Sequence, residues 1–127
     1  MSTNLPQELI PFFEALGQRK ARGLVGLDVR GISSVSDFMI VCSGMSNRQV
    51  TAMGEHVARQ MKKRKNKALG IEGLREGQWV LLDFGDVVVH IFQDSTRDFY
   101  DLEGLWADAK KYYPVSRGEE KEADSGD

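Results

Sequence analysis

The chain of 127 residues carries 17 basic and 19 acidic side chains, and its hydrophobic content of 41% is typical of one globular domain. The net charge of −2 argues against a dedicated, strongly basic nucleic-acid binder, and the single cysteine, Cys42, excludes an internal disulfide. The N-terminal residues lack the pattern of a signal peptide, and no apolar run approaches the ~20 residues of a membrane span. We therefore expect a soluble, cytoplasmic protein without a membrane partner.

The first half of the chain begins with a predicted helix and two predicted strands. The helix has one apolar face, made of Leu9, Phe12, Phe13 and Leu16. Pro11 marks either the start of this helix or a bend in it, because proline breaks a helix interior. Strands are predicted at residues 24–29 and 37–43, and the nearly continuous apolar sequence of the second is typical of a strand buried on both faces.

The second helix has the clearest start signal, because Ser46 and Gln49 have the spacing of a capping box. Its buried stripe consists of Val50, Met53, Val57 and Met61. We expect His56 to face the solvent. The basic run Lys62–Lys67 suits a solvated helix end, since cations there complement the helix dipole, and contact with RNA phosphates is the alternative.

The second half of the chain predicts three strands, at residues 68–73, 78–84 and 86–92, with Gly85 in the turn between the last two. A final helix is predicted at residues 97–113. Its shared apolar side consists of Leu102, Leu105 and Trp106. The fold class is therefore α/β: a mixed five-stranded sheet packed by helices, with one strand–helix–strand crossover and one antiparallel hairpin.

We expect residues 1–113 to form a single domain and residues 114–127 to form an acidic, disordered C-terminal tail. From Ser116 to Asp127 the chain has five acidic and two basic residues and no large apolar side chain. Such a segment cannot bury enough apolar surface to offset the entropy of ordering.

Patterns for metal binding and nucleophilic catalysis are weak. A zinc site needs three or four ligands, whereas His56 and His90 lie far apart in the sequence and have no cysteine pair beside them. Cys42 follows an apolar run and is predicted to be a small buried hydrophobe. His90 has two interpretations, a hydrogen-bonded and half-buried residue or the polar element of a recognition surface.

Two features leave an enzyme as the alternative hypothesis. The loop Ser43–Ser46, between a strand and a helix, could hold a phosphate, although capping already explains its polar residues. Asp83 and Asp86 could hold a divalent metal, as in nucleotidyl transfer, although polar turn residues are the simpler interpretation. We favour a protein without catalytic residues, metal or cofactor. The alternative is a nucleotide-binding or nucleotidyltransferase-type enzyme that uses this loop and these two aspartates.

The predicted hairpin has large apolar residues on both sides. Trp79, Leu81 and Asp83 share one side of the strand, while Val80 and Leu82 share the other. Either helices cover both faces of the sheet, or one face is left exposed as an interface.

The register of this hairpin has two solutions. A two-residue turn of Phe84 and Gly85 places Trp79 opposite His90, but it also sets two aspartates face to face, which is unfavourable. A three-residue turn with a bulge at Gly85 shifts the register and avoids this repulsion.

Four segments taken together resemble the ribosomal silencing factor family, also called RsfS or Iojap-like. They are SDFMIVCSGMSNRQV, LGIEG, WVLLDFGDVVVHIF and YDLEGLW, in this order. The resemblance implies a nucleotidyltransferase-like fold without catalytic residues, and hence a protein that is not an enzyme. It further implies binding to the fourteenth protein of the large ribosomal subunit on the intersubunit face. The bound factor would block association with the small subunit and repress translation under nutrient limitation or in stationary phase.

The resemblance also implies where the partner binds. It places Trp79 and Tyr100 at the contact, where each supplies apolar area and a polar tip. Neighbours in the same segments complete the predicted partner-binding set: Asp83, His90, Asp101 and Leu102. Two further expectations are a peripheral contact with ribosomal RNA and a homodimer of the free protein through the same apolar face.

Overall fold

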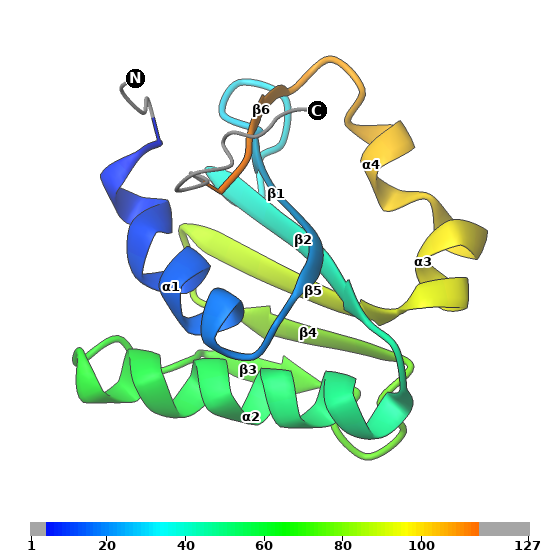
Figure 1. Cartoon of the computed structure of the whole chain (residues 1–127). Coiled ribbons are helices and arrows are strands. Elements are labelled where there is room, and N and C mark those ends of the chain that lie inside the picture. Colours follow the sequence, from blue (N-terminus) through cyan, green and yellow to red (C-terminus); the bar gives the residue numbers. More distant parts are fainter. Residues whose placement is uncertain (1–4, 115–127) are drawn as a thin grey trace.

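The computed structural model describes residues 5–114, which form a six-stranded mixed sheet between two groups of helices. Figure 1 shows α1 and α2 on one side of the sheet and α3 and α4 on the other. In chain order the elements are a 3-10 turn (Gln7–Leu9), α1 (Ile10–Gln18), β1 (Arg22–Asp28), β2 (Phe38–Gly44), α2 (Asn47–Lys63), β3 (Gly70–Glu72), β4 (Trp79–Asp83), β5 (Val87–Gln93), α3 (Asp94–Tyr100), α4 (Leu102–Leu105) and β6 (Lys110–Tyr112).

The strand order is β3-β4-β5-β2-β1-β6. β2 and β5 pair in parallel, and α2 lies within the crossover that joins them, whereas every other pairing in the described sheet is antiparallel. The predicted α/β class with a mixed sheet is thus confirmed. No helix within residues 5–114 is long and apolar enough to cross a membrane.

The prediction of five strands and one long final helix is wrong. The segment 97–113 splits into two short helices and a sixth strand, because Asp101 adopts a left-handed conformation that ends α3. β6 then pairs with β1, with Gly26 opposite Tyr112, and occupies what would otherwise be an open edge.

The beginnings of both long helices agree with the sequence. Pro11 lies in the first turn of α1, so the helix starts near this proline, which is one of the two predicted alternatives. The hydroxyl of Ser46 accepts a hydrogen bond from the Gln49 N–H at 3.1 Å, and the Gln49 side chain accepts one from the Met45 N–H at 2.8 Å. The predicted capping box is therefore present, with its return bond one residue earlier than in the standard pattern.

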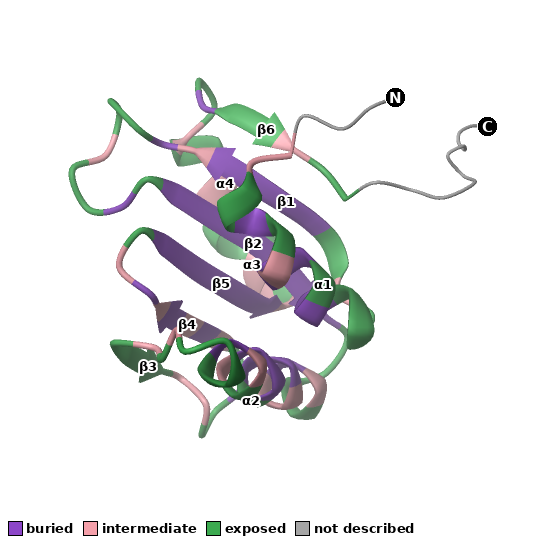
Figure 2. Cartoon of the chain, turned by 90° about the vertical axis from the view of Figure 1, so that its left-hand side faces the viewer, coloured by how far each residue is buried: buried purple, intermediate pink, exposed green. Residues whose placement is uncertain are grey.

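The core lies mainly between the sheet and the α1–α2 layer, where the apolar faces predicted for both helices are buried. Figure 2, which looks onto this layer, shows buried strands behind helices whose outer sides are exposed. One prediction here is wrong: His56 is only 8% exposed, and its Nε2 lies 2.7 Å from Gln18 Oε1. The end of α1 covers this position on α2, which the period of α2 alone does not reveal.

The second face of the sheet carries a smaller apolar cluster. Its buried members are Val25, Leu27, Val29, Met39, Val41, Phe92 and Ala109. Trp79, Leu102 and Trp106 pack against this cluster while remaining partly exposed. Helices lie on both faces of the sheet, but the short helices on this second face cover it only in part and leave accessible aromatic surface.

The predicted domain, residues 1–113, includes all the described helices and strands. The tail predicted at residues 114–127 lies outside the described residues, apart from Pro114.

Candidate functional site

The hairpin of β4 and β5 determines which side chains meet on the second face. Trp79 pairs with Phe92, and Leu81 pairs with His90. Neither predicted turn occurs: the loop consists of Gly85 and Asp86, and the Phe84 N–H donates to the Val87 carbonyl at 2.9 Å. Phe84 is kept out of the turn because its side chain is buried against Phe12, with ring centroids 4.9 Å apart.

Trp79 is the centre of the site. Its indole ring lies 4.8 Å from the ring of Phe92 and 4.8 Å from that of Tyr100, measured between centroids. Its Nε1–H donates to Nδ1 of His90 at 3.0 Å. An imidazole nitrogen that accepts must be unprotonated, so His90 is neutral and carries its proton on Nε2.

Burial reinforces this protonation state of His90. The residue is 6% exposed, and burial lowers the pKa of His90 from 6.5 to about 4. Of the two interpretations of His90, the hydrogen-bonded one is confirmed, and the residue is more deeply buried than expected. It also belongs to the aromatic cluster, because its acceptor nitrogen orients the ring of Trp79.

α3 brings the aromatic residues of the last segment to this cluster. It begins directly after β5, where Gln93 Oε1 accepts from the Ser95 N–H at 3.1 Å. Phe99 is 81% exposed and Tyr100 is 51% exposed, and their rings meet edge to face with centroids 5.1 Å apart. We call the set Trp79, Leu81, His90, Phe99 and Tyr100 the Trp79 surface.

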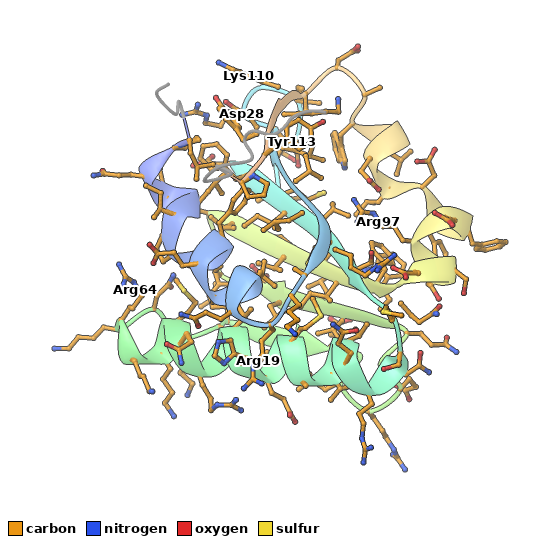
Figure 3. All side chains as sticks on the ribbon, viewed as in Figure 1. Arg19, Asp28, Arg64, Arg97, Lys110 and Tyr113 are labelled. Atoms are coloured by element: carbon orange, nitrogen blue, oxygen red, sulfur yellow. The ribbon has the colours of Figure 1, made fainter. Side chains whose placement is uncertain are left out.

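Arg97 connects α3 to its neighbours, and Figure 3 shows this residue on the side of the sheet where α3 and α4 lie. Its guanidinium donates to Glu103 Oε2 at 2.7 Å, to the Gly23 carbonyl at 2.8 Å and to the Arg22 carbonyl at 3.2 Å. A longer contact of 3.4 Å reaches the Ser43 hydroxyl. One side chain therefore connects α3 to α4 and to both strands beside it.

The structure brings together some of the predicted partner-binding residues and separates others. Trp79, His90 and Tyr100 are in mutual or shared contact, and Leu102 packs on the apolar cluster beneath them. Asp101 is exposed and follows Tyr100 directly.

Asp83, by contrast, lies at the far end of β4, roughly 13 Å from Trp79 along the strand. Its carboxylate accepts from the Gly85 N–H at 2.8 Å, as a turn residue does.

Sequence reasoning missed Phe99, Phe92 and Arg97. Phe99 directly precedes a predicted site residue, but nothing in the sequence indicates that it is the more exposed of the two. The sequence predicts Phe92 only as part of a strand, since its position under Trp79 depends on the register. The ion pair of Arg97 with Glu103 follows from the break between α3 and α4, which the prediction of one continuous helix concealed.

Several residues of the enzyme hypothesis have structural roles. Ser46 caps α2, and Ser43 is 4% exposed in β2. Cys42 is fully buried as predicted, and burial raises the pKa of Cys42 to about 12. Within residues 5–114, no group of three or more histidine, cysteine, aspartate or glutamate side chains is placed to hold a metal ion.

Comparisons with known proteins point to one family. The model of the family "Ribosomal silencing factor during starvation" (RsfS) matches residues 2–127. The ribosomal silencing factor RsfS of Haemophilus influenzae is 43% identical over 94 residues, which cover 74% of this chain and 92% of that protein. A more distant relative is the mitochondrial assembly of ribosomal large subunit protein 1 of Mus musculus, which is 32% identical over 72% of this chain and 41% of its own length.

A solved structure agrees in fold. The crystal structure of protein CV0518 from Chromobacterium violaceum superposes with a TM-score of 0.77 at 40% sequence identity, covering 84% of this chain and 88% of that one.

Proposed function

Because the chain belongs to the ribosomal silencing factor (RsfS) family, whose members are regulatory proteins rather than enzymes, we propose that it docks on the large ribosomal subunit through the Trp79 surface. The proposed partner is the fourteenth protein of that subunit, on the face that meets the small subunit. A folded domain bound there occupies space that the small subunit needs, so docking blocks subunit association and represses translation. Nutrient limitation and stationary phase are the proposed conditions, and the cytoplasm is the proposed location.

The observation that carries this proposal is the exposure of two adjacent aromatic rings, one of which rests on a partly buried tryptophan. Phe99 and Tyr100 are accessible, yet Tyr100 rests on Trp79, which is itself oriented by His90. Aromatic residues on rigid supports supply the largest share of binding energy in many interfaces. Little conformational entropy of Trp79 and Tyr100 is lost on docking, because their rings already pack against each other in the free protein.

Two carboxylates suit a basic ribosomal protein as the partner, one beside the Trp79 surface and one farther along β4. Asp101 is exposed beside Tyr100, and Asp83 lies at the other end of β4. Such carboxylates would guide the approach of lysine and arginine side chains more than they would strengthen the final complex. The same exposed rings would favour a homodimer of the free protein, because dimerisation would remove this apolar patch from water.

Co-sedimentation with isolated large subunits tests the proposal. We expect Tyr100→Ala to lower the affinity for these subunits at least tenfold, and Trp79→Ala to lower it further. Tyr113→Ala is the matched control, because Tyr113 is 62% exposed and lies near the opposite edge of the sheet, beyond β6. Unfolding curves of all three variants separate lost binding from lost structure. Unchanged affinity in Tyr100→Ala, with the fold intact, would contradict the site.

A further inference from the structure

A second surface, made of cations, lies where α1 ends over α2. His56 of α2 contacts Gln18 at the end of α1, so Arg19 and Lys20 lie beside this part of α2. Arg59 and Lys63 follow His56 by three and seven residues and therefore extend from the same side of the helix. After burial, the strongest influences that lower the pKa of His56 are the charges of Arg19, Arg59 and Lys63, as expected if all three surround it.

These cations have no anionic partners in the described part of the chain. Residues 56–71 contain six basic and no acidic side chains. The ion pairs formed within residues 5–114 involve Arg22, Arg30 and Arg97, and none involves a residue of this surface. Glu55 is one turn before Arg59 but does not come within ion-pairing distance of it. Figure 3 shows Arg19 and Arg64 at the α1–α2 layer, whereas Arg97 lies on the α3–α4 side of the sheet.

Both helices end on a lysine where glycine would be the less strained residue. Lys20 follows α1 with φ 59°, and Lys65 follows α2 with φ 65°. The next amide then donates back to the helix, from Ala21 to Leu16 and from Asn66 to Met61. This left-handed closing position is usually glycine, because a side chain there crowds the backbone. The helix dipole favours cations in the last turn, but it does not require lysine at the strained position.

We propose that the ends of α1 and α2 form a surface that binds the phosphate backbone of ribosomal RNA, with Arg19, Lys20, Arg59, Lys63 and Lys65 as its cations. Lysine and arginine side chains without anionic partners are the groups that bind RNA phosphates.

The RNA surface rests on the proposed docking for its biological setting. The two surfaces belong to opposite faces of the sheet, because the α1–α2 core includes Val80 and Leu82 whereas Trp79 packs on the other cluster. One molecule can therefore contact a ribosomal protein and RNA together.

The double variant Lys20→Gly/Lys65→Gly tests this inference without weakening the fold. Replacing each lysine with glycine removes one charge and relieves the left-handed backbone, so the melting temperature should rise while RNA binding falls. Arg48→Gln/Arg75→Gln is the matched control, since it removes two exposed charges near the beginning of α2. The probes are a fluorescent 20-base-pair RNA duplex, isolated large subunits and the isolated fourteenth ribosomal protein.

Loss of two phosphate contacts should weaken the dependence of RNA affinity on salt concentration by a defined amount. Between 50 and 200 mM KCl, the affinity of the unsubstituted protein for the duplex and for the subunits should fall about tenfold more than that of the double variant. The control should behave like the unsubstituted protein. Binding to the isolated ribosomal protein should stay unchanged in both variants.

Three outcomes would overturn the RNA surface. The first is an equal salt dependence of RNA affinity in the double variant and the unsubstituted protein. The second is an equal loss of RNA affinity in the double variant and its control. The third is a loss of affinity that is confined to the isolated ribosomal protein. Failure of the docking proposal is distinguishable, because Tyr100→Ala would then leave subunit binding intact while the duplex measurements still report on the cations.

Discussion

The indole Nε1–H of Trp79 donates to Nδ1 of His90 across two neighbouring strands at 3.0 Å. This bond joins the polar edge of a partly exposed ring to a buried, neutral base. The aromatic surface therefore has a fixed orientation before any partner arrives.

Replacing His90 with leucine should weaken the fold and the proposed docking together. The Trp79 N–H loses its acceptor, which costs about 1–3 kcal/mol of unfolding free energy. His90→Gln is the control, because its amide oxygen can still accept. In a double-mutant cycle, the cost of His90→Leu should shrink when residue 79 is phenylalanine, which has no N–H. Urea unfolding measures the loss of unfolding free energy caused by His90→Leu with tryptophan and with phenylalanine at position 79. Equal losses in the two proteins would show that His90 does not act as the acceptor of the Trp79 N–H.

Stability should fall as the pH falls from 6.5 toward 4. Because the folded-state pKa of His90 is about 4 and its ordinary value is 6.5, the unfolded chain takes up a proton first. The stabilising effect is complete above pH 6.5, and about 3 kcal/mol is lost by pH 4 and below. The lowered pKa of His56 acts in the same direction. Urea unfolding at several pH values should show a smaller loss for His90→Gln, and an unchanged profile would contradict the assignment.

Removing the side chain of Arg97 should loosen α3. In Arg97→Leu, the half-buried carboxylate of Glu103 and the carbonyl of Gly23 lose their donor, and we expect a loss of about 2–3 kcal/mol. Arg22→Gln breaks the more exposed ion pair with Asp94 and should cost no more than about 0.5 kcal/mol. Hydrogen exchange should show faster opening of α3 only in Arg97→Leu. Similar exchange in both variants would argue against Arg97 as the support of this helix.

Two glycines should respond oppositely to substitution by alanine. Gly73 has φ 87°, and a Cβ there would collide with the backbone carbonyl of Trp79. Gly73→Ala should therefore destabilise the fold by more than about 1 kcal/mol and disturb β4. Gly17 lies inside α1 with open space around it, so Gly17→Ala should stabilise by about 0.5–1 kcal/mol. Thermal unfolding should show a lower melting temperature for Gly73→Ala and a higher one for Gly17→Ala. Melting temperatures that shift in the same direction would contradict this prediction.

Phe99 separates binding from folding more clearly than Trp79 does. Its ring is 81% exposed, so Phe99→Ser should change the unfolding free energy by no more than about 0.5 kcal/mol. Affinity for isolated large subunits should nevertheless fall at least tenfold, and any homodimer of the free protein should become weaker. Sedimentation measures both effects on one sample. Full affinity in this variant would place the docking contact elsewhere.

Much of the local structure was predictable because it depends on residues close together in the chain. The capping box at Ser46 and the apolar stripe of α2 follow from contacts three or four residues apart. The continuous apolar run of β2 likewise predicted a strand that is buried throughout. The four family-like segments identified the family for the same reason, since each can be recognised within its own residues.

What the tertiary structure alone decided depends on contacts between distant segments. Lys110–Tyr112 has no strong local preference, and it becomes a strand because β1 offers an unpaired edge. His56 is buried because the end of α1 covers it, and the hairpin turn is displaced because Phe84 is held by Phe12. The sequence, through its resemblance to the family, predicted that Trp79, His90 and Tyr100 belong to one contact, but it did not predict how they touch one another. Their mutual geometry comes from the register of β4 on β5 and from the anchoring of α3 by Arg97, because such contacts depend on pairing across the sheet and not on spacing along the chain.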